Sequence, residues 1–372
     1  MKKWIPWILV VCFVAYIMGA FRAPKPKDGY DLAAFGRLPV LANGRIQPFD
    51  SIARNTLLTM SGKSKVKLSD GKYMGPTEWI IEAMTRPDDA ATRKIFRTQH
   101  PDVESMLGTL GAKLEYYSFN DLTNHFEEID TQARKIMEAE EVREAAGEDG
   151  SKLRTPFQKD LMHLYQSLVQ FHFLQNTLQP EGATDFKHEL HVYKEKIPVG
   201  LAALRASENG EKFEEVDLQT LSAFFKRYEG ISKITFALIV PPLPDQSRDS
   251  WNNIGALLMD GMRSSEIHPA VSHLAAIASG YAKKQPTEFN QAIADYRVWL
   301  QMNKLVPDLK KGREEYFFNQ VDPFTQSMAI YLVALLLAFT YWITLAPWVR
   351  KSAVSLGVLA FIVHTLGLGF RM

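Results

Sequence analysis

The apolar residues of this chain are concentrated at its two ends, and this distribution constrains the fold more than any other feature. Residues 4–21 contain no charged side chain, and residues 328–348 and 352–370 form two further apolar runs. A helix needs about 20 apolar residues to cross a bilayer, so each run is long enough or nearly so. The pattern predicts an integral membrane protein with three transmembrane helices and one large domain between the first and the second.

The runs divide the chain into an N-terminal anchor, a large domain and two further membrane helices. These segments are expected at residues 1–21, 22–325, 326–349 and 352–370. A cleaved signal peptide is the alternative for the first run. Cleavage after Ala20 would place Met18 where a small residue is preferred, which favours an uncleaved anchor.

Basic residues beside the runs give the expected orientation. Lys2 and Lys3 precede the first run, and Arg350 and Lys351 stand between the second and the third. Because Lys and Arg are enriched in cytoplasmic loops, both clusters are expected on the cytoplasmic side. The large domain and the end of the third helix, residues 371–372, are then expected outside the cytoplasm.

Composition excludes some classes of function. The net charge is +1, so the chain has no basic excess with which to neutralise nucleic-acid phosphates. Cys12 is the single cysteine and lies inside the first apolar run. An intramolecular disulfide and a Cys-x-x-Cys-His motif for covalent haem attachment are therefore both excluded. The large domain must be held together by its core.

The sequence between the membrane runs has mostly helical periodicity and few alternating, strand-like runs. Helices are expected at residues 78–84, 121–144, 155–178, 218–228, 249–262, 270–283 and 288–303. Asp249 and Thr287 are the expected N-caps of two of these helices. Residues 134–152 are highly charged and are expected to form a solvated helix end and loop. The predicted fold class is mainly α, with a helical extracytoplasmic domain.

The pair His188-Glu-Leu-His191 has a spacing that can bind a metal, because residues three apart share one face of a helix. It lacks the four-residue spacing and the intervening general base of the His-Glu-x-x-His metalloproteases. An exposed polar helix explains the pair better, so no metal site is expected. A metal-dependent hydrolase is the weak alternative.

The other histidines of the large domain show no catalytic pattern. His163 and His172 lie nine residues apart on an apolar-rich helix, where packing or interface roles are expected. His268 and His273 flank a helix start without a third ligand. Nucleophile-elbow, phosphate-loop and dinucleotide motifs do not occur in the sequence, so the catalytic residues stay unknown.

His364 differs from these because it lies inside the third apolar run. An ionisable group in a membrane helix is costly and usually faces a protein interior, which makes it a functional candidate. Gly367 and Gly369 let another helix or a flat ligand approach closely. Two readings stay open: a neutral histidine bonded to a neighbouring helix, or a residue near a cofactor.

Several stretches resemble one family. Residues 36–54 (GRLPVLANGRIQPFDSIAR) are similar to a segment of CcsA/ResC-type cytochrome c biogenesis proteins that have a large N-terminal extension. Residues 79–103, 117–122, 315–324 and 364–372 fit the same family in the same order. The resemblance implies a bacterial inner-membrane protein of the system II machinery, with haem as cofactor and a ResB-like protein and apocytochrome c as partners.

The sequence departs from the family in one respect. The family's cytochrome c synthase chemistry is carried by a Trp-rich external loop with haem-ligating histidines near it. Here the seven tryptophans are scattered, and the sequence ends at Met372, where the family usually continues. Whether the chain is an enzyme is therefore left open, and haem ligands are expected outside it. The chain is expected to be the N-terminal part of a longer protein or one half of a split one.

The expected function is assistance of haem delivery and attachment to apocytochrome c, with the extracytoplasmic domain docking a partner. Arg37, Arg45 and Arg54, with Asp50, form the candidate partner surface, because guanidinium groups bind carboxylates such as haem propionates bidentately. The alternative for these residues is a structural clamp near lipid headgroups. By the resemblance, His364 lines a haem-handling core. A membrane-anchored scaffold or assembly factor without a haem role is the alternative function.

Overall fold

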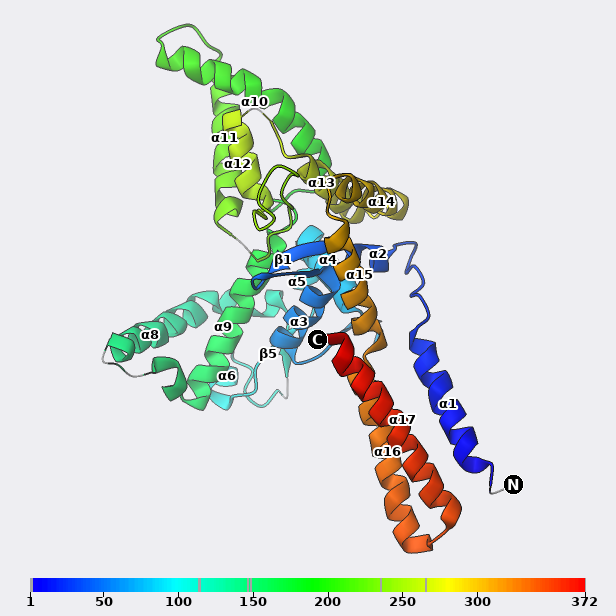
Figure 1. Cartoon of the computed structure of the whole chain (residues 1–372). Coiled ribbons are helices and arrows are strands. Elements are labelled where there is room, and N and C mark those ends of the chain that lie inside the picture. Colours follow the sequence, from blue (N-terminus) through cyan, green and yellow to red (C-terminus); the bar gives the residue numbers. More distant parts are fainter. Residues whose placement is uncertain are drawn as a thin grey trace. The chain divides into compact units, whose positions relative to one another are not determined.

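The computed structural model describes residues 3–112, 115–145, 147, 149–234, 236–264 and 266–371. These residues are mainly helical, as the sequence predicts, and they divide into two compact units (Figure 1). We call Met1–Lys25 with Lys310–Met372 the apolar unit and Pro26–Leu309 the central domain. Lys2, which belongs to the basic pair before the first apolar run, and Met372, which follows the third run, lie outside the described residues.

Helices make up most of the central domain. They are α2 (Leu32–Gly36), α3 (Phe49–Ser61), α4 (Pro76–Thr85), α5 (Pro87–Ala91), α6 (Pro101–Met106), α7 (Phe119–Leu122), η1 (Thr123–His125), α8 (Phe126–Ala145), η2 (Gly150–Leu153), α9 (Pro156–Gln175), α10 (Phe186–Glu208), α11 (Glu215–Lys233), α12 (Ile254–Ser264), α13 (Pro269–Ala282) and α14 (Pro286–Met302). α15 (Val306–Val321) follows them.

The strands form short antiparallel pairs. They are β1 (Pro39–Ala42) with β2 (Arg45–Pro48), β3 (Val66–Lys67) with β4 (Tyr73–Met74), and β5 (Phe96–Arg97) with β6 (Tyr116–Tyr117). The first pair turns at Asn43 and Gly44, whose φ angles are 51° and 73°. An Asn-Gly pair favours such a two-residue hairpin, because both residues tolerate positive φ. Leu41 also pairs with Leu238, so β1 is bonded on both sides.

Helix α4 is the centre of the core. It contacts α2, α3, α9 and α13, and every one of its residues except Glu78 is buried. Trp79 is among the largest fully buried side chains. A helix that is apolar on nearly all sides needs neighbours on all sides, and the surrounding helices supply them.

Helices α11 and α12 pack closely at Gly255, which gives a paired prediction. A Cβ at Gly255 would lie 2.5 Å from the backbone N of Ser232, whereas a Cβ at Gly230 of α11 would meet no described atom within 4 Å. We expect Gly255→Ala to lower the free energy of unfolding by about 1–3 kcal/mol through overpacking. Gly230→Ala is expected to raise it by roughly 0.5–1 kcal/mol, because alanine is the better helix former. Chemical denaturation of the two variants measures both values, and equal signs would contradict the packing.

Two helix starts differ from the sequence prediction. α12 begins at Ile254, and Asn253 Oδ1, rather than Asp249, accepts a hydrogen bond from the Ala256 N–H at 2.6 Å. The pairing of Val240 with Asn252 keeps the preceding chain extended, so the helix starts later than the sequence pattern indicates. α14 has Gln285 at its N-cap and Pro286 in its first turn, which places Thr287 inside the helix. Both N-cap predictions are wrong.

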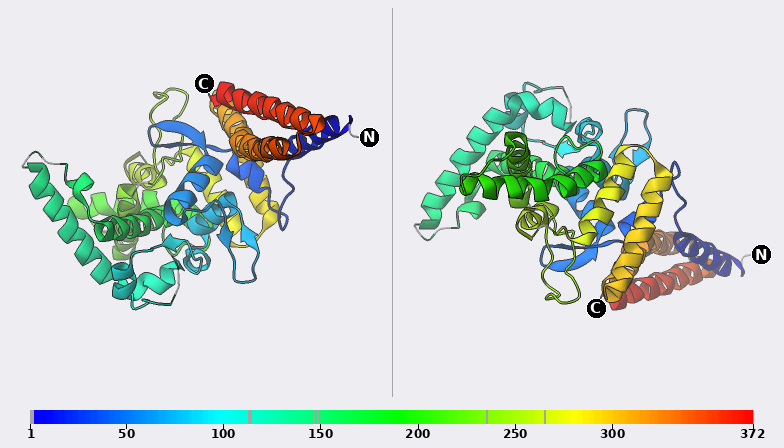
Figure 2. Two further views of the ribbon diagram at one scale, coloured as in Figure 1. Left: turned by 90° about the horizontal axis from the view of Figure 1, so that it is seen from below. Right: turned by 90° about the horizontal axis from the view of Figure 1, so that it is seen from above.

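The apolar unit contains α1 (Ile5–Ala20), α16 (Pro323–Thr344) and α17 (Pro347–Arg371). α16 and α17 run side by side and are joined by a short turn at Leu345, which has a φ of 52° (Figures 1 and 2). Arg350 and Lys351 therefore lie in the first turn of α17 rather than in the turn between the helices. Ile330, Ala334, Leu356 and Ala360 form the buried contact, and Phe13 of α1 is among the side chains packed against it.

The ends of these helices are fixed by contacts within the apolar unit. Gln320 donates to the carbonyl oxygens of Ala20 and Arg22 at 2.9 and 2.6 Å, and the rings of Phe324 and His364 lie 5.7 Å apart. The end of α1, the start of α16 and the end of α17 are thus together. Lys3 and the start of α17, which carries Arg350, lie toward the opposite end.

Two helical segments of the described chain, Val306–Thr344 and Pro347–Arg371, are long and apolar enough to cross a membrane. Most of the large apolar side chains of α16 point outward rather than into the unit, with Leu335 51% and Ile343 86% exposed. An outward apolar surface of this kind is typical of a helix in contact with lipid. α1 has 16 residues, which is shorter than a full span, and its role as a third span stays a prediction.

Candidate functional site

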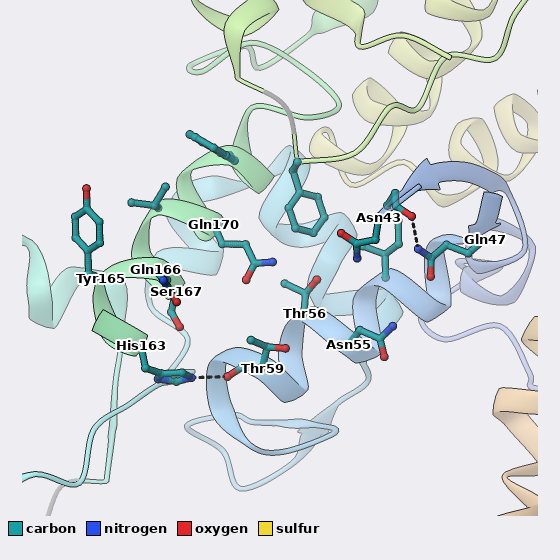
Figure 3. Close-up of a pocket in the computed structure, with 15 residues that line it drawn as sticks. Asn43, Gln47, Asn55, Thr56, Thr59, His163, Tyr165, Gln166, Ser167 and Gln170 are labelled. Atoms are coloured by element: carbon teal, nitrogen blue, oxygen red, sulfur yellow. Dashed lines mark hydrogen bonds between the residues drawn. The ribbon is translucent and has the colours of Figure 1, made fainter. Parts of the chain in front are cut away.

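A cleft of about 520 Å³ opens in the central domain between α3, α9 and the β1–β2 hairpin (Figure 3). α9 supplies one wall and α3 the facing wall, while the turn of the hairpin lies at one end. Phe236 also lines the cleft. Asn43, Gln47 and Ile52 belong to residues 36–54, one of the segments on which the expected family resemblance rests. The cleft therefore joins this segment to a helix more than a hundred residues away in sequence.

The cleft wall from α9 is partly polar because the helix has two faces. Leu161, Leu164, Leu168 and Phe171 are buried in the core. The cleft is lined by four polar residues of the helix, His163, Gln166, Ser167 and Gln170, and also by Tyr165, Val169 and Phe173. The four polar residues lie three or four positions apart, so they form one stripe along the helix. Thr155 and Gln158 form a capping box at the start of α9, which fixes where the stripe begins.

α3 presents a matching stripe across the cleft. Ile52, Asn55, Thr56 and Thr59 line this wall and again recur at helical spacing. Figure 3 shows Gln170 extending from α9 into the space beside Thr56. The two helices are linked at one end of the cleft, where His163 Nε2 lies 2.7 Å from the Thr59 carbonyl oxygen.

Gln47 holds the hairpin end of the cleft in place. Its side chain is buried, and its Nε2 donates to the Ala42 carbonyl oxygen at 3.0 Å. Its Oε1 accepts from the Arg45 guanidinium at 2.9 Å. A buried amide that is bonded at both ends is rigid, so Asn43 at the turn is displayed from a fixed position.

The cleft is electrically neutral and rich in side-chain amides. Among the described residues, no Asp, Glu, Lys or Arg lines it. The amides of Asn43, Asn55, Gln166 and Gln170 make no hydrogen bond to any other described residue. Each offers two N–H donors and one acceptor oxygen, so together they can pair with a ligand that shows donors and acceptors in alternation. A main chain in extended conformation is such a ligand.

The four residues of the predicted partner surface differ in their exposure and in their bonding partners. Asp50 is 2% exposed and binds Arg54 Nε at 2.6 Å and Thr77 Oγ1 at 2.8 Å, so it joins α3 to α4 inside the domain. Arg54 is 38% exposed beside it. Arg37 is half-buried at the end of α2, and Arg45 is exposed and bonded to Gln47. The position of Asp50 favours a structural role for that residue.

The remaining histidines of the central domain are not gathered into a site. His191 Nε2 lies 3.3 Å from Glu195 on α10, and His188 stands one turn earlier on the same helix. Among the described residues, no group of three or more His, Cys, Asp or Glu side chains could hold a metal ion. His268 and His273 pack against Trp299, and burial lowers the pKa of both imidazoles below the usual value. Both therefore favour the neutral form.

His364 is half-buried in the apolar unit and lies against the rings of Phe324 and Tyr331 of α16. A Cβ at Gly367 would lie 3.1 Å from Pro323, so this glycine serves the close approach of α16. A Cβ at Gly369 would meet no described atom within 4 Å. His364 is the only histidine in the sequence of this unit, which supplies one imidazole and no second histidine ligand.

Two local patterns in the sequence indicate parts of this cleft. Asn43-Gly44 between apolar runs predicts a hairpin, and the polar spacing on residues 163–170 indicates a helix face turned from the core. Neither signal shows that the two segments meet.

A scan against protein-family models finds no match for this chain, and a search of curated proteins finds no relative.

Proposed function

We propose that this protein is a membrane-anchored component of bacterial cytochrome c biogenesis, and that its central domain holds apocytochrome c in the cleft while haem is delivered. The observation that carries the proposal is the cleft that residues 36–54 share with α3 and α9, which has side-chain amides but no Asp, Glu, Lys or Arg among its described lining residues. We take the apocytochrome to be unfolded when haem is attached. An unfolded chain exposes main-chain N–H and C=O groups, which carboxamides can bind regardless of sequence.

The apolar unit supports the membrane part of the proposal. We take α1, α16 and α17 as three spans, with Lys3, Arg350 and Lys351 on the cytoplasmic side of the bacterial inner membrane. The chain leaves the helices toward the central domain from their other end, so this topology puts the domain in the periplasm. The proposal therefore places apocytochrome docking on that side.

Haem itself has no assigned place in the central cleft. His163 is bonded to Thr59, and no basic side chain among the described lining residues could pair with a haem propionate. We therefore propose that the haem ligands lie outside this chain, on a ResB-like partner or on membrane helices beyond those described, and that His364 at most lines that path. The neutral cleft also suits the alternative function, a periplasmic scaffold without a haem role.

A binding experiment tests the docking function. The full chain in neutral detergent is titrated into a fluorescein-labelled, unfolded apocytochrome c polypeptide, and anisotropy gives the Kd. We expect saturable binding, and we expect the double variant Asn55→Ala with Gln170→Ala to weaken it. Two neutral hydrogen bonds of about 0.5–1.5 kcal/mol each correspond to a loss of roughly 5- to 150-fold.

The matched control removes two carboxamides outside the cleft. Asn120 and Gln219 are on α7 and α11 and line no part of it, so Asn120→Ala with Gln219→Ala should bind like the wild type. Equal Kd values for the cleft and control variants would refute docking in the cleft.

The scaffold alternative predicts that the purified protein stays colourless when haem is supplied and that His364→Ala leaves cytochrome c levels unchanged.

A further inference from the structure

The central domain has a second pocket, of about 370 Å³, which shares no lining residue with the cleft. It lies between residues 61–69, which end α3 and include β3, and residues 92–95 before β5, with Tyr116 of β6 at its side. Its volume is in the range of small-molecule sites, about 300–1,000 Å³. Its lining is chemically unlike that of the neutral cleft.

Positive charge dominates this second pocket. Lys63, Lys65, Lys67 and Lys94 belong to its lining, and among the described lining residues there is no Asp or Glu. Within the described part of the chain, none of these lysines has a carboxylate oxygen within 4.0 Å. Like charges held together without counter-ions repel one another, so an anion that binds here gains from all of them.

The neighbouring cations show that this excess is local. Lys72 is on the β3–β4 hairpin too, but it is paired with Asp70 at 3.1 Å. Arg93 lines the pocket, and its guanidinium is held by the buried Glu82 through bonds of 2.7 and 3.0 Å. The domain thus neutralises the cations that stabilise the fold and leaves the lysines of this pocket open to a ligand.

The pocket also has an apolar side. Val66 and Ile95 are buried beneath it, and Leu68 and Tyr116 are half-buried at its wall. The Lys63 ammonium lies 3.8 Å from the centroid of the Tyr116 ring, which is a cation–π contact. A ligand with only charge would leave this apolar wall unused.

We propose that this pocket binds a ligand carrying two or more oxyanion groups, phosphate or carboxylate, on an apolar or aromatic body. The lysines bind the oxyanions, and the wall of Val66, Leu68, Ile95 and Tyr116 contacts the body. A soluble metabolite and an anionic lipid headgroup both present this chemistry. The inference is independent of the proposed docking function, because it uses other residues.

Pyrene tetrasulfonate, a fluorescent aromatic tetra-anion, is the probe for the test. Its anisotropy is followed as the full chain in neutral detergent is added. We expect saturable binding that weakens steeply with salt, as charge pairing does. Lys63→Gln with Lys94→Gln should weaken it by roughly tenfold or more per lysine, at about 1.4 kcal/mol for each factor of ten. The control, Lys72→Gln, removes a paired lysine of the same hairpin and should leave the Kd unchanged.

Two further arms separate the parts of the proposal. Tyr116→Ala should weaken binding of the pyrene probe more than that of competing inorganic pyrophosphate, since pyrophosphate has no apolar body and loses only the contact that holds Lys63. Stronger displacement of the probe by pyrophosphate identifies a soluble source, and stronger displacement by soluble dihexanoyl phosphatidylserine, which carries a phosphate and a carboxylate, identifies a headgroup source. An equal Kd for wild type and the double lysine variant, or no saturable binding, would overturn the proposal.

Discussion

Replacing Glu82 by alanine is expected to lower the free energy of unfolding of the central domain by about 3–5 kcal/mol, the usual loss when one partner of a buried ion pair is removed. Glu82 is 2% exposed in the middle of the core helix α4. Its carboxylate binds Arg93 through two hydrogen bonds and lies 3.5 Å from Arg86. Arg86 in turn stacks over the Tyr281 ring of α13, at 4.5 Å from its centroid.

The size of the loss follows from what remains after the substitution. Arg86 and Arg93 are only about one-fifth exposed, at 20% and 22%, and would lose the carboxylate that balances their desolvation. The control is Glu229→Ala on α11, whose partner Lys233 is an exposed residue one turn away. Exposed pairs contribute about 0–1 kcal/mol. Urea denaturation of the full chain in neutral detergent measures the free energy of unfolding of both variants. Similar decreases for the two variants would contradict the role given to Glu82.

Replacing Leu335 by arginine is expected to disfavour membrane insertion of α16 by about 2.5–3.5 kcal/mol, the cost of an arginine near the centre of a transmembrane helix. Leu335 is close to the middle of α16 and is 51% exposed on the outer face of the apolar unit. If lipid covers this face, the guanidinium has no water there. The fraction of chain that resists alkaline extraction from membranes should therefore fall.

Leu204→Arg is the matched control for that substitution. Leu204 is a 36%-exposed leucine on α10 of the central domain, where water can solvate the new charge. Surface substitutions of this kind usually change stability by less than about 0.5 kcal/mol. Equal membrane retention of the two variants would mean that the outer face of α16 is covered by protein rather than lipid.

The helices of the core were predictable where their periodicity is strong. The expected helix at residues 155–178 begins at Thr155, and Thr155 is the N-cap of α9. A polar helix was expected around His188 and His191, but the extent of α10 was not predicted, because Pro198 stands in its interior and a proline usually ends a helix. α3 was missed because only part of its circumference is apolar, as its polar residues face the cleft.

The charged stretch at residues 134–152 shows why a local pattern is incomplete. Polar composition predicts a solvated loop, and most of these side chains are exposed. Glu140, however, is buried against Arg154, which donates two hydrogen bonds of 2.5 and 2.8 Å to its carboxylate, and a Cβ at Gly150 would lie 3.0 Å from the Glu140 backbone. The pairing of η2 with α8 depends on contacts between segments, which composition does not report.

The cleft depends on tertiary contacts to a greater degree. Thr56 and Gln170, which lie beside each other in the cleft, are 114 residues apart in sequence, and their approach depends on the packing of α3 and α9 around α4. From the sequence, the partner surface was predicted at the arginines in and around residues 36–54. In the structure it is the amides of Asn43 and Asn55, rather than the charged groups, that face the cleft.

The most direct test of the proposed role in cytochrome c biogenesis uses cells that lack this gene and cells in which a variant replaces it, and measures their content of haem-stained c-type cytochromes. We expect deletion to abolish or strongly reduce these cytochromes. The wild type and the control pair Asn120→Ala with Gln219→Ala should restore them, whereas Asn55→Ala with Gln170→Ala should restore them poorly at equal protein level. Unchanged cytochrome content after deletion would contradict a role in cytochrome c biogenesis. Full restoration by the cleft variant would contradict docking in the cleft.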